Sequence, residues 1–252
     1  MIPQPDIPPI QLYGPLAIHM FGVLVAIGIL VGARWTRTRG RQLGLVDEKV
    51  AAMITWSLVG GFVFAHIFDV FAYQIHEKIT WRDFLNPFGG LSSFGGFIGA
   101  LAGLFAWCNR NNEPVMPYAD SLGYGLSIGW MFGRLGCFSA HDHPGRFTTF
   151  FLGVKYPDGV RHDLGFDEAL WAALIAALFF VLARKPRPLG LYVTMLTIAY
   201  APVRFGLDFL RVTGGAGADP RYFGLTPAQW GCIVVLGAGV GLLQWTRKHA
   251  KE

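Results

Sequence analysis

Long apolar runs separated by short polar segments form the dominant pattern of this chain. Residues 16–33 include His19 as their only strongly polar side chain, and residues 170–183 include none. A helix that crosses a bilayer needs about 17–25 predominantly apolar residues, so runs of this kind predict membrane spans. We expect seven spans, at residues 15–35, 50–74, 91–108, 119–138, 166–183, 188–210 and 226–245. The pattern therefore predicts an all-α, polytopic membrane protein with a single domain over residues 1–252.

The basic residues between the spans predict the orientation of the chain. Lys and Arg concentrate in the cytoplasmic loops of membrane proteins. Twelve of the 21 follow the first, third, fifth and seventh spans, two lie inside spans and seven lie on the opposite side. The twelve are Arg34, Arg37, Arg39, Arg41, Lys49, Arg110, Arg184, Lys185, Arg187, Arg247, Lys248 and Lys251. The first fourteen residues contain neither type, and they do not resemble a cleavable signal peptide, which has a basic leader. We therefore expect the N-terminus outside and the C-terminus in the cytoplasm.

Composition agrees with a membrane protein and excludes other classes. Of the 252 residues, 53% are hydrophobic and 15% are charged, whereas a soluble domain has about 25% charged residues. The cytoplasmic loops explain the net charge of +5, so we expect no nucleic-acid partner. The three cysteines, Cys108, Cys137 and Cys232, fall on different spans, and they imply no disulfide framework.

Glycines recur at helical spacing in the third and fourth spans. The third span carries two overlapping GxxxG steps at residues 95–103, and the fourth carries two at residues 125–133. Small residues four apart share one helix face and let backbones approach closely, so one interpretation is close packing of these two spans. The pair Gly95-Gly96 at the start of a span permits a second, in which backbone N–H groups approach a ligand phosphate. The sequence leaves both interpretations open for this pair.

Two arginines, Arg134 and Arg204, fall inside predicted spans. An arginine at the centre of a bilayer costs about 2.5–3.5 kcal/mol on insertion scales, so each needs a reason. Asp208 lies one helical turn after Arg204 and Arg211 follows three residues later, so an internal Arg–Asp pair is one explanation. The other, which we favour, is a cationic pocket for an anionic headgroup, because arginine offers a planar fork of donors to phosphate oxygens.

A group of reactive side chains follows Arg134 at the outer end of the fourth span. Cys137, His141, Asp142 and His143 lie within ten residues of it. Histidine is the natural proton acceptor near neutral pH, and a carboxylate can orient it. A polar cap at the membrane interface is the simpler interpretation. Zinc binding by Cys137, His141 and His143 is a further one, but this spacing is not a strong zinc pattern, and we expect neither a resident metal nor a cofactor.

The residues around Arg134 resemble the signature of the bacterial prolipoprotein diacylglyceryl transferases. The family pattern has Gly-Arg-hydrophobic-Gly-Asn-Phe, a short polar stretch with an acidic residue, and then Gly-Arg. Residues 133–138 and Gly145-Arg146 align with this pattern without a gap, and Asp142 falls on the acidic position. Other segments that resemble family motifs, in the same order, are His19–Gly22, Ser93–Gly99, Arg161–Glu168, Arg204–Arg211 and Gln229.

The resemblance, together with the proton-accepting chemistry of the histidines after Arg134, indicates which residues form the site. The catalytic set would be Arg134, Arg204, His141, Asp142 and His143. The substrate-binding set would be His19, Gly95, Gly96, Cys137, Arg146, Arg161, His162, Glu168, Asp208, Arg211 and Gln229. The layout of the seven spans, with the N-terminus outside, is also that of the family.

The resemblance also implies the reaction and its place. The enzyme would transfer diacylglycerol from phosphatidylglycerol to the thiol of a lipobox cysteine in a secreted preprotein, and glycerol phosphate would leave. The partners would be phosphatidylglycerol, the preprotein and membrane lipids, at the outer leaflet of the bacterial inner (plasma) membrane. Arginines would bind the phosphate and stabilise charge on the leaving group. The attacking thiol belongs to the substrate, so the enzyme needs no cysteine of its own.

Several positions depart from the family pattern. Phe94 replaces a histidine before Gly-Gly, Phe21 replaces a tyrosine and Cys137 replaces an asparagine; Asp163 and Gly165 replace a proline and a glutamine. Phenylalanine cannot accept a proton, so we hypothesise that His141 or His143 supplies the proton acceptor. Two alternatives remain: a paralogue that uses the same phospholipid site for another acceptor, and a phospholipid-binding membrane protein without catalysis. A channel or transporter is disfavoured, because the two halves show no matching pair of broken helices.

Overall fold

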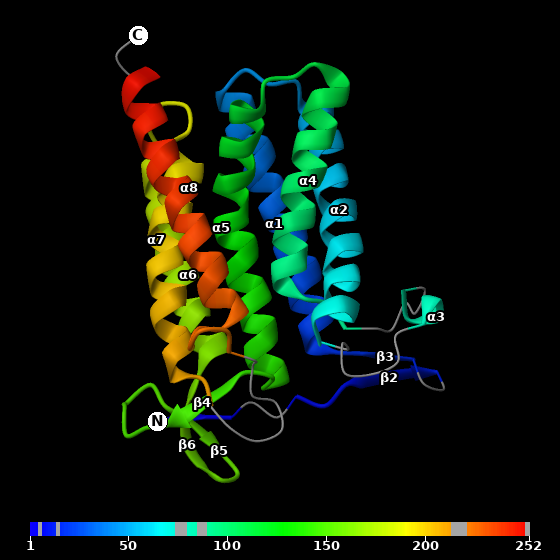
Figure 1. The fold of residues 1–252 in the computed structure, drawn as a ribbon, viewed down its shortest axis with the longest axis vertical. Coiled ribbons are helices and arrows are strands. Elements are labelled where there is room, and N and C mark those ends of the chain that lie inside the picture. Colours follow the sequence, from blue (N-terminus) through cyan, green and yellow to red (C-terminus); the bar gives the residue numbers. More distant parts are fainter. Residues whose placement is uncertain (5–6, 14–15, 74–79, 85–89, 213–220, 250–252) are drawn as a thin grey trace. The chain divides into compact units, whose positions relative to one another are not determined.

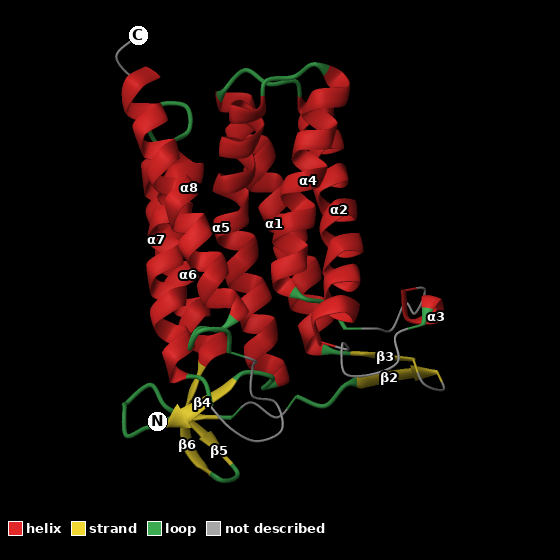
Figure 2. Cartoon of the chain, in the orientation of Figure 1, coloured by secondary structure: helices red, strands yellow, loops and turns green. Residues whose placement is uncertain are grey.

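The computed structural model describes residues 1–4, 7–13, 16–73, 80–84, 90–212 and 221–249. Helices dominate this part of the chain (Figures 1 and 2). The long helices are α1 (Met20–Gln42), α2 (Asp47–Tyr73), α4 (Ser93–Asn111), α5 (Val115–Ala140), α6 (Leu164–Leu182), α7 (Leu191–Leu207) and α8 (Pro227–His249). Each of them overlaps one predicted span in order. The remaining α-helix of the described residues, α3 (Trp81–Phe84), is a single turn.

Apolar helices long enough to cross a membrane confirm the membrane character of the chain. Within the described residues, five segments qualify, with mean hydropathy between 1.3 and 1.8: Met20–Gln42, Asp47–Phe71, Leu164–Leu182, Leu191–Leu210 and Pro227–Lys248. These five correspond to α1, α2, α6, α7 and α8. The helices α4 and α5 are not among them, so the count of seven spans stays a prediction.

The chain is mostly helical, but the segment between α5 and α6, outside the predicted spans, departs from the expected all-α class. It contains β4 (Pro144–Phe147), β5 (Val154–Tyr156) and β6 (Gly159–Asp163). With β1 (Ile2–Pro3) they form a four-stranded sheet in the order β1-β5-β6-β4. Strands β5 and β6 pair as a hairpin around Pro157-Asp158, and Gly159 has a φ of 141°. Pro-Asp-Gly is a turn signal that the sequence offered.

A second ladder precedes the first helix. Strands β2 (Ile10–Tyr13) and β3 (Leu16–Ile18) pair in antiparallel fashion. The predicted first span begins at residue 15, whereas α1 begins at Met20. The apolar residues just before α1 are therefore extended, because hydrophobicity alone does not separate a short strand from the first turn of a helix.

The chain divides into two compact units, and each is described by itself. The small unit comprises residues 37–122. In it, α4 packs closely on α2: a Cβ on Gly99 would lie 2.1 Å from the carbonyl oxygen of Gly60, and a Cβ on Gly103 would lie 2.3 Å from that of Trp56. The GxxxG steps of the third span are thus packing surfaces, and their partner is α2.

The large unit comprises residues 1–36 and 123–252. Here α5 packs on α1, because a Cβ on Gly125 would lie 2.3 Å from the carbonyl oxygen of Gly32. A Cβ on Gly129 would lie 3.2 Å from that of Gly28, whereas one on Gly133 would meet no atom within 4 Å. The expected close packing is confirmed for both glycine-rich helices: the glycine steps of α4 pack on α2, and Gly125 and Gly129 of α5 pack on α1.

Candidate functional site

Charged side chains gather at one end of the helices of the large unit. Arg134 lies near the end of α5, Glu168 near the start of α6 and Arg204 near the end of α7. The connection through β4, β5 and β6 joins the end of α5 to the start of α6, so these helix ends meet beside the small sheet (Figure 1). The 3₁₀ turn η1 (Asp208–Leu210) and the start of α8 complete the surroundings.

Glu168 joins the two buried arginines. Its Oε2 lies 3.0 Å from Nε of Arg134, and its Oε1 lies 3.1 Å from Nε of Arg204. The hydroxyl of Tyr200 donates to Oε2 at 3.2 Å. The side chains of Arg134, Glu168 and Arg204 are only 5%, 3% and 7% exposed. Buried charges are tolerated only when they are paired and hydrogen-bonded, so this carboxylate is what permits two arginines inside the protein.

Asp208 binds the other side of Arg204. Nη1 of Arg204 donates to Oδ1 of Asp208 at 2.7 Å, and Nε of Arg211 lies 3.0 Å from the same oxygen. The hydroxyl of Thr226 donates to Oδ2. The internal Arg–Asp pair is thus confirmed. It does not exclude the cationic pocket, because three arginines of this cluster face two carboxylates and one positive charge remains in excess.

Two aromatic residues that we had not selected from the sequence border the cluster. The guanidinium carbon of Arg134 lies 4.6 Å from the centroid of the Trp130 ring, at a distance typical of a cation–π contact. Trp130 packs edge-on against Tyr200, with centroids 5.7 Å apart. Each lies four residues before its arginine, Trp130 before Arg134 and Tyr200 before Arg204. Helical spacing from the two arginines was therefore the signal that could have found them.

The two histidines after α5 contact different partners. His141 has a φ of 52°, which reverses the chain after Ala140. Its ring contacts Phe138 and Tyr156, and its Nδ1 lies 3.8 Å from Oδ2 of Asp163. Nδ1 of His143 instead contacts Oδ1 of Asp142. The role of either histidine as proton acceptor stays a prediction.

Asp163 is a buried carboxylate that the sequence reasoning named only as a departure from the family pattern. Its Oδ1 caps α6 by accepting the N–H of Phe166 at 2.9 Å, and its Oδ2 accepts the hydroxyl of Tyr156 at 2.6 Å. Burial raises the pKa of the Asp163 carboxyl, and burial together with this hydrogen bond raises the pKa of Tyr156. An aspartate directly before an apolar helical run is an N-cap signal.

Cys137 connects the arginine cluster to the segment after α5. Nη1 of Arg134 donates to Sγ of Cys137 at 3.9 Å, one helical turn away. Cys137, Asp142 and His143 place their ligand atoms within 4.8 Å of one another. The zinc interpretation from the sequence named Cys137, His141 and His143. In the structure, Asp142 rather than His141 lies close to the other two.

Two residues expected to bind substrate, Arg161 and His162, lie on β6 and contact the small sheet and the start of α6. The guanidinium of Arg161 donates to Asp158 and, through Nη1, to the carbonyl of Gly145 at 3.0 Å. It lies over the Phe147 ring at 3.7 Å, and its hydrogen bonds lower the pKa of Asp158. Nδ1 of His162 lies 3.5 Å from Oδ2 of Asp167. These contacts fasten β4 to β6 and β6 to α6.

Other expected substrate-binding residues are exposed or serve helix ends. His19 and Arg146 are exposed. Gln229 forms a capping box with Thr226: its Oε1 accepts the N–H of Thr226 at 3.0 Å, and its own N–H donates to Oγ1 of Thr226 at 3.2 Å. The spacing Thr-x-x-Gln before an apolar run predicts this motif.

The glycine pair of the third span lies in the small unit. The N–H of Gly95 donates to Oγ of Ser92 at 3.5 Å, and that of Gly96 donates to the Ser92 carbonyl at 2.9 Å. A Cβ on Gly95 would lie 2.5 Å from the carbonyl oxygen of Phe64. These contacts favour the packing interpretation. The side chain of Phe94 lies outside what the structure describes.

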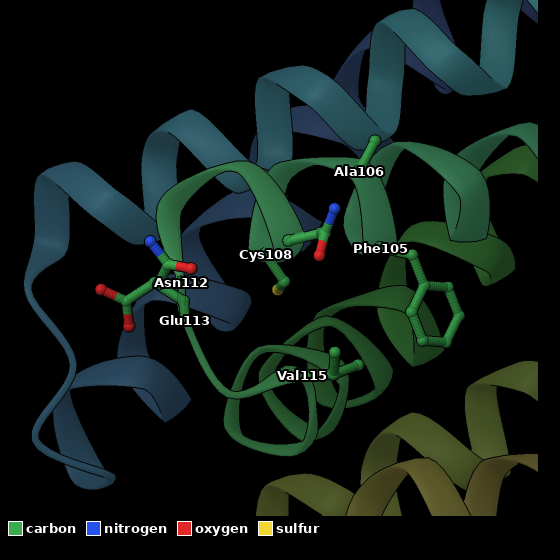
Figure 3. Close-up of a pocket in the computed structure, with 7 residues that line it drawn as sticks. Phe105, Ala106, Cys108, Asn112, Glu113 and Val115 are labelled. Atoms are coloured by element: carbon green, nitrogen blue, oxygen red, sulfur yellow. The ribbon is translucent and has the colours of Figure 1, made fainter.

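A cavity of about 580 Å³ also lies in the small unit, where α4 ends and α5 begins (Figure 3). Its walls are Phe105, Ala106, Cys108, Asn109, Asn112, Glu113 and Val115. None of these is a predicted site residue. The candidate site is therefore the charged cluster of the large unit rather than the cavity.

Comparisons with known proteins agree on one family. The sequence profile described as prolipoprotein diacylglyceryl transferase matches residues 9–245. The chain is 28% identical to a phosphatidylglycerol–prolipoprotein diacylglyceryl transferase of Pseudomonas putida, over 97% of this chain and 96% of that protein. It is 28% identical to the protein of that name from Pseudomonas fluorescens (99% and 97%) and 25% identical to the one from Chromohalobacter salexigens (99% and 96%).

Proposed function

Because the chain belongs to the prolipoprotein diacylglyceryl transferase family, we propose that it transfers the diacylglyceryl group of phosphatidylglycerol to the lipobox cysteine thiol of a prolipoprotein. The names of its relatives state the donor and the acceptor. The observation that carries the proposal is the buried cluster of Arg134, Glu168 and Arg204. Its excess positive charge suits one phosphodiester headgroup.

The reaction requires stabilisation of the negative charge on the leaving glycerol phosphate. The acceptor sulfur bonds to the terminal glycerol carbon of the diacylglyceryl group, the bond from that carbon to the phosphate oxygen breaks, and glycerol phosphate leaves with a second negative charge. Preorganised arginine donors in a water-poor site stabilise such developing charge. Arg134 and Arg204 supply these donors, and the ion pairs with Glu168 and Asp208 hold their guanidinium groups in place.

We further propose a multi-pass inner-membrane protein of one domain with seven spans, in which α4 and α5 also cross the bilayer. The Lys and Arg residues near the C-terminal ends of α1 and α8 and directly after α6 support a cytoplasmic position for those helix ends. Arg134, Glu168 and Arg204 lie toward the opposite helix ends. In the orientation that we propose, the arginine cluster lies in the outer leaflet, where a secreted preprotein emerges.

The first test uses purified protein, phosphatidylglycerol and a synthetic lipobox peptide, with mass spectrometry of the peptide. We expect a diacylglyceryl adduct on the cysteine that disappears in Arg134→Ala. Arg184→Ala is the matched control, because this exposed arginine follows α6 at its other end, and it should leave the adduct unchanged. Bound phospholipid without any adduct would contradict the proposal and support a binding protein without catalysis.

The proton acceptor for the thiol is tested separately. We propose His141 or His143 for this role, each backed by a carboxylate, Asp163 or Asp142. The double variant His141→Ala/His143→Ala should abolish adduct formation while phospholipid binding persists. Full transfer by the folded double variant would exclude both histidines.

A further inference from the structure

The end of α5 brings three different metal-ligating side chains together. Cys137 lies in the last turn of the helix, which ends at Ala140, and the chain turns at His141, whose φ is 52°. After this turn Asp142 and His143 lie near the thiol of Cys137, and one ligand atom of each of the three residues lies within 4.8 Å of the other two. Among the residues that the structure describes, no other group of three or more His, Cys, Asp and Glu side chains has its ligand atoms this close together.

The chemistry of these ligands selects one class of metal. Thiolate sulfur, imidazole nitrogen and carboxylate oxygen are the ligand types of Zn²⁺, and three protein ligands with an open fourth position are typical of catalytic zinc sites. Ca²⁺ and Mg²⁺ prefer sites made of oxygen alone. We propose that Cys137, Asp142 and His143 bind Zn²⁺ and that its fourth position takes the acceptor thiol. This inference rests on the proposed function.

Charge and position both suit a metal at this place. A Cys137 thiolate and an Asp142 carboxylate together neutralise Zn²⁺, so the site can exist beside a buried arginine. Nη1 of Arg134 lies 3.9 Å from Sγ of Cys137, so the metal site adjoins the arginine that we propose to hold the lipid phosphate. Donor and acceptor binding would then meet within one turn of α5.

The metal would activate the acceptor thiol in place of the histidine that the family pattern has at residue 94. A thiol that coordinates a metal loses its proton outright, because the cation stabilises the thiolate. Phe94 stands where the family pattern has histidine, and Cys137 stands where it has asparagine. A zinc-bound acceptor thiolate makes a strong general base at residue 94 unnecessary.

The step balances without any oxidant or reductant. The acceptor thiol gives up its proton when it coordinates Zn²⁺. Because His143 is then a metal ligand, His141 is the histidine of the two that is left to pass this proton to water. The sulfur then uses an electron pair to bond to the glycerol carbon, and the pair of the breaking carbon–oxygen bond goes to the phosphate of the departing glycerol phosphate. The product thioether is a weaker ligand than a thiolate, so the next thiol replaces it and the metal keeps its oxidation state.

Cobalt spectroscopy tests the site independently of transfer. The purified full-length protein is freed of metal and titrated with Co²⁺. We expect one Co²⁺ per chain, with the thiolate-to-cobalt band and the visible bands of a tetrahedral site. Cys137→Ser should remove the thiolate band, and His143→Gln should weaken binding at least tenfold. Cys232→Ser is the matched control, because this buried thiol lies on α8, and it should keep the spectrum.

The acceptor role has its own readout. A lipobox peptide should change the cobalt spectrum, and the same peptide with serine in place of cysteine should not. His141→Ala should leave Co²⁺ binding unchanged, because His141 faces Asp163 and Tyr156 instead. A spectrum that does not respond to the peptide thiol would overturn the acceptor role.

The outcomes separate this inference from the proposed function. Absence of the thiolate band in the folded wild-type protein, or full transfer after metal removal, would overturn the zinc site and leave the transferase intact. A cobalt spectrum that responds to the thiol, without any adduct under conditions of lipid binding, would overturn the transferase and leave the metal site. Melting curves confirm that each variant is folded, and His143→Gln remains available if Cys137→Ser does not fold.

Discussion

Removing the charge of Glu168 is the sharpest perturbation of the arginine cluster. The side chain touches Arg134 and Arg204 and accepts a hydrogen bond from Tyr200, all in the interior of the large unit. The substitution Glu168→Gln keeps the shape of the side chain and one acceptor oxygen. It leaves both guanidinium groups buried and removes one of the two carboxylates that balance them.

The magnitude follows from the geometry. Breaking a buried ion pair by neutralising one partner costs about 3–5 kcal/mol, because the other charge stays buried. Glutamine still accepts hydrogen bonds and Asp208 still binds Arg204, so we expect a loss at the lower end, about 3 kcal/mol. For a protein of this size, each kcal/mol lowers Tm by roughly 2–4 °C. The expected decrease is therefore about 6–12 °C.

Thermal unfolding of the detergent-solubilised protein measures this decrease. The matched control is Asp167→Asn, one residue earlier on α6, because Asp167 faces His162 at 3.5 Å rather than a buried arginine. The control should shift Tm by no more than about 4 °C, since a single weaker pair contributes about 1 kcal/mol. A decrease for Glu168→Gln no larger than that of the control would refute the reasoning that this carboxylate stabilises the two arginines.

Three further predictions concern packing, pH and donor geometry. Gly125→Ala should lower Tm, because the added Cβ would lie 2.3 Å from a backbone oxygen of α1. Gly133→Ala should not lower Tm, because its Cβ would have no atom within 4 Å. Equal melting curves for the two variants would contradict this. Burial raises the pKa of Asp163 above its unfolded value of about 3.9, so the ionised form is disfavoured in the folded protein and stability falls as pH rises through the folded pKa. Asp163→Asn should lack this dependence in a pH series of Tm. Arg204→Lys keeps the charge but loses the planar fork, so transfer kinetics should show a roughly ten- to hundredfold lower kcat/KM, the effect of about one charge-assisted hydrogen bond.

Much of the helical framework could be predicted because a membrane leaves few alternatives. Backbone groups in hydrocarbon must bond within their own segment, so a long apolar run has one solution, the helix. The same physics singled out Arg134 and Arg204, since buried charges need a purpose. The hairpin β5–β6 was missed although its Pro-Asp-Gly turn was visible. Its strands have three and five residues, so the alternation of polar and apolar residues along them is too short to identify a strand.

The sequence by itself determined the helices, the presence of charges inside them and the family resemblance. Only the tertiary structure decided which charges meet: that Glu168 joins arginines from two other helices, and that Asp163 faces His141. It also decided that Asp142, not His141, joins Cys137 and His143. Spacing along a chain fixes neighbours within one helix, where residues three or four apart share a face. Which helices pair depends on packing over the whole unit. The same packing decides where consecutive side chains point after a turn of the backbone.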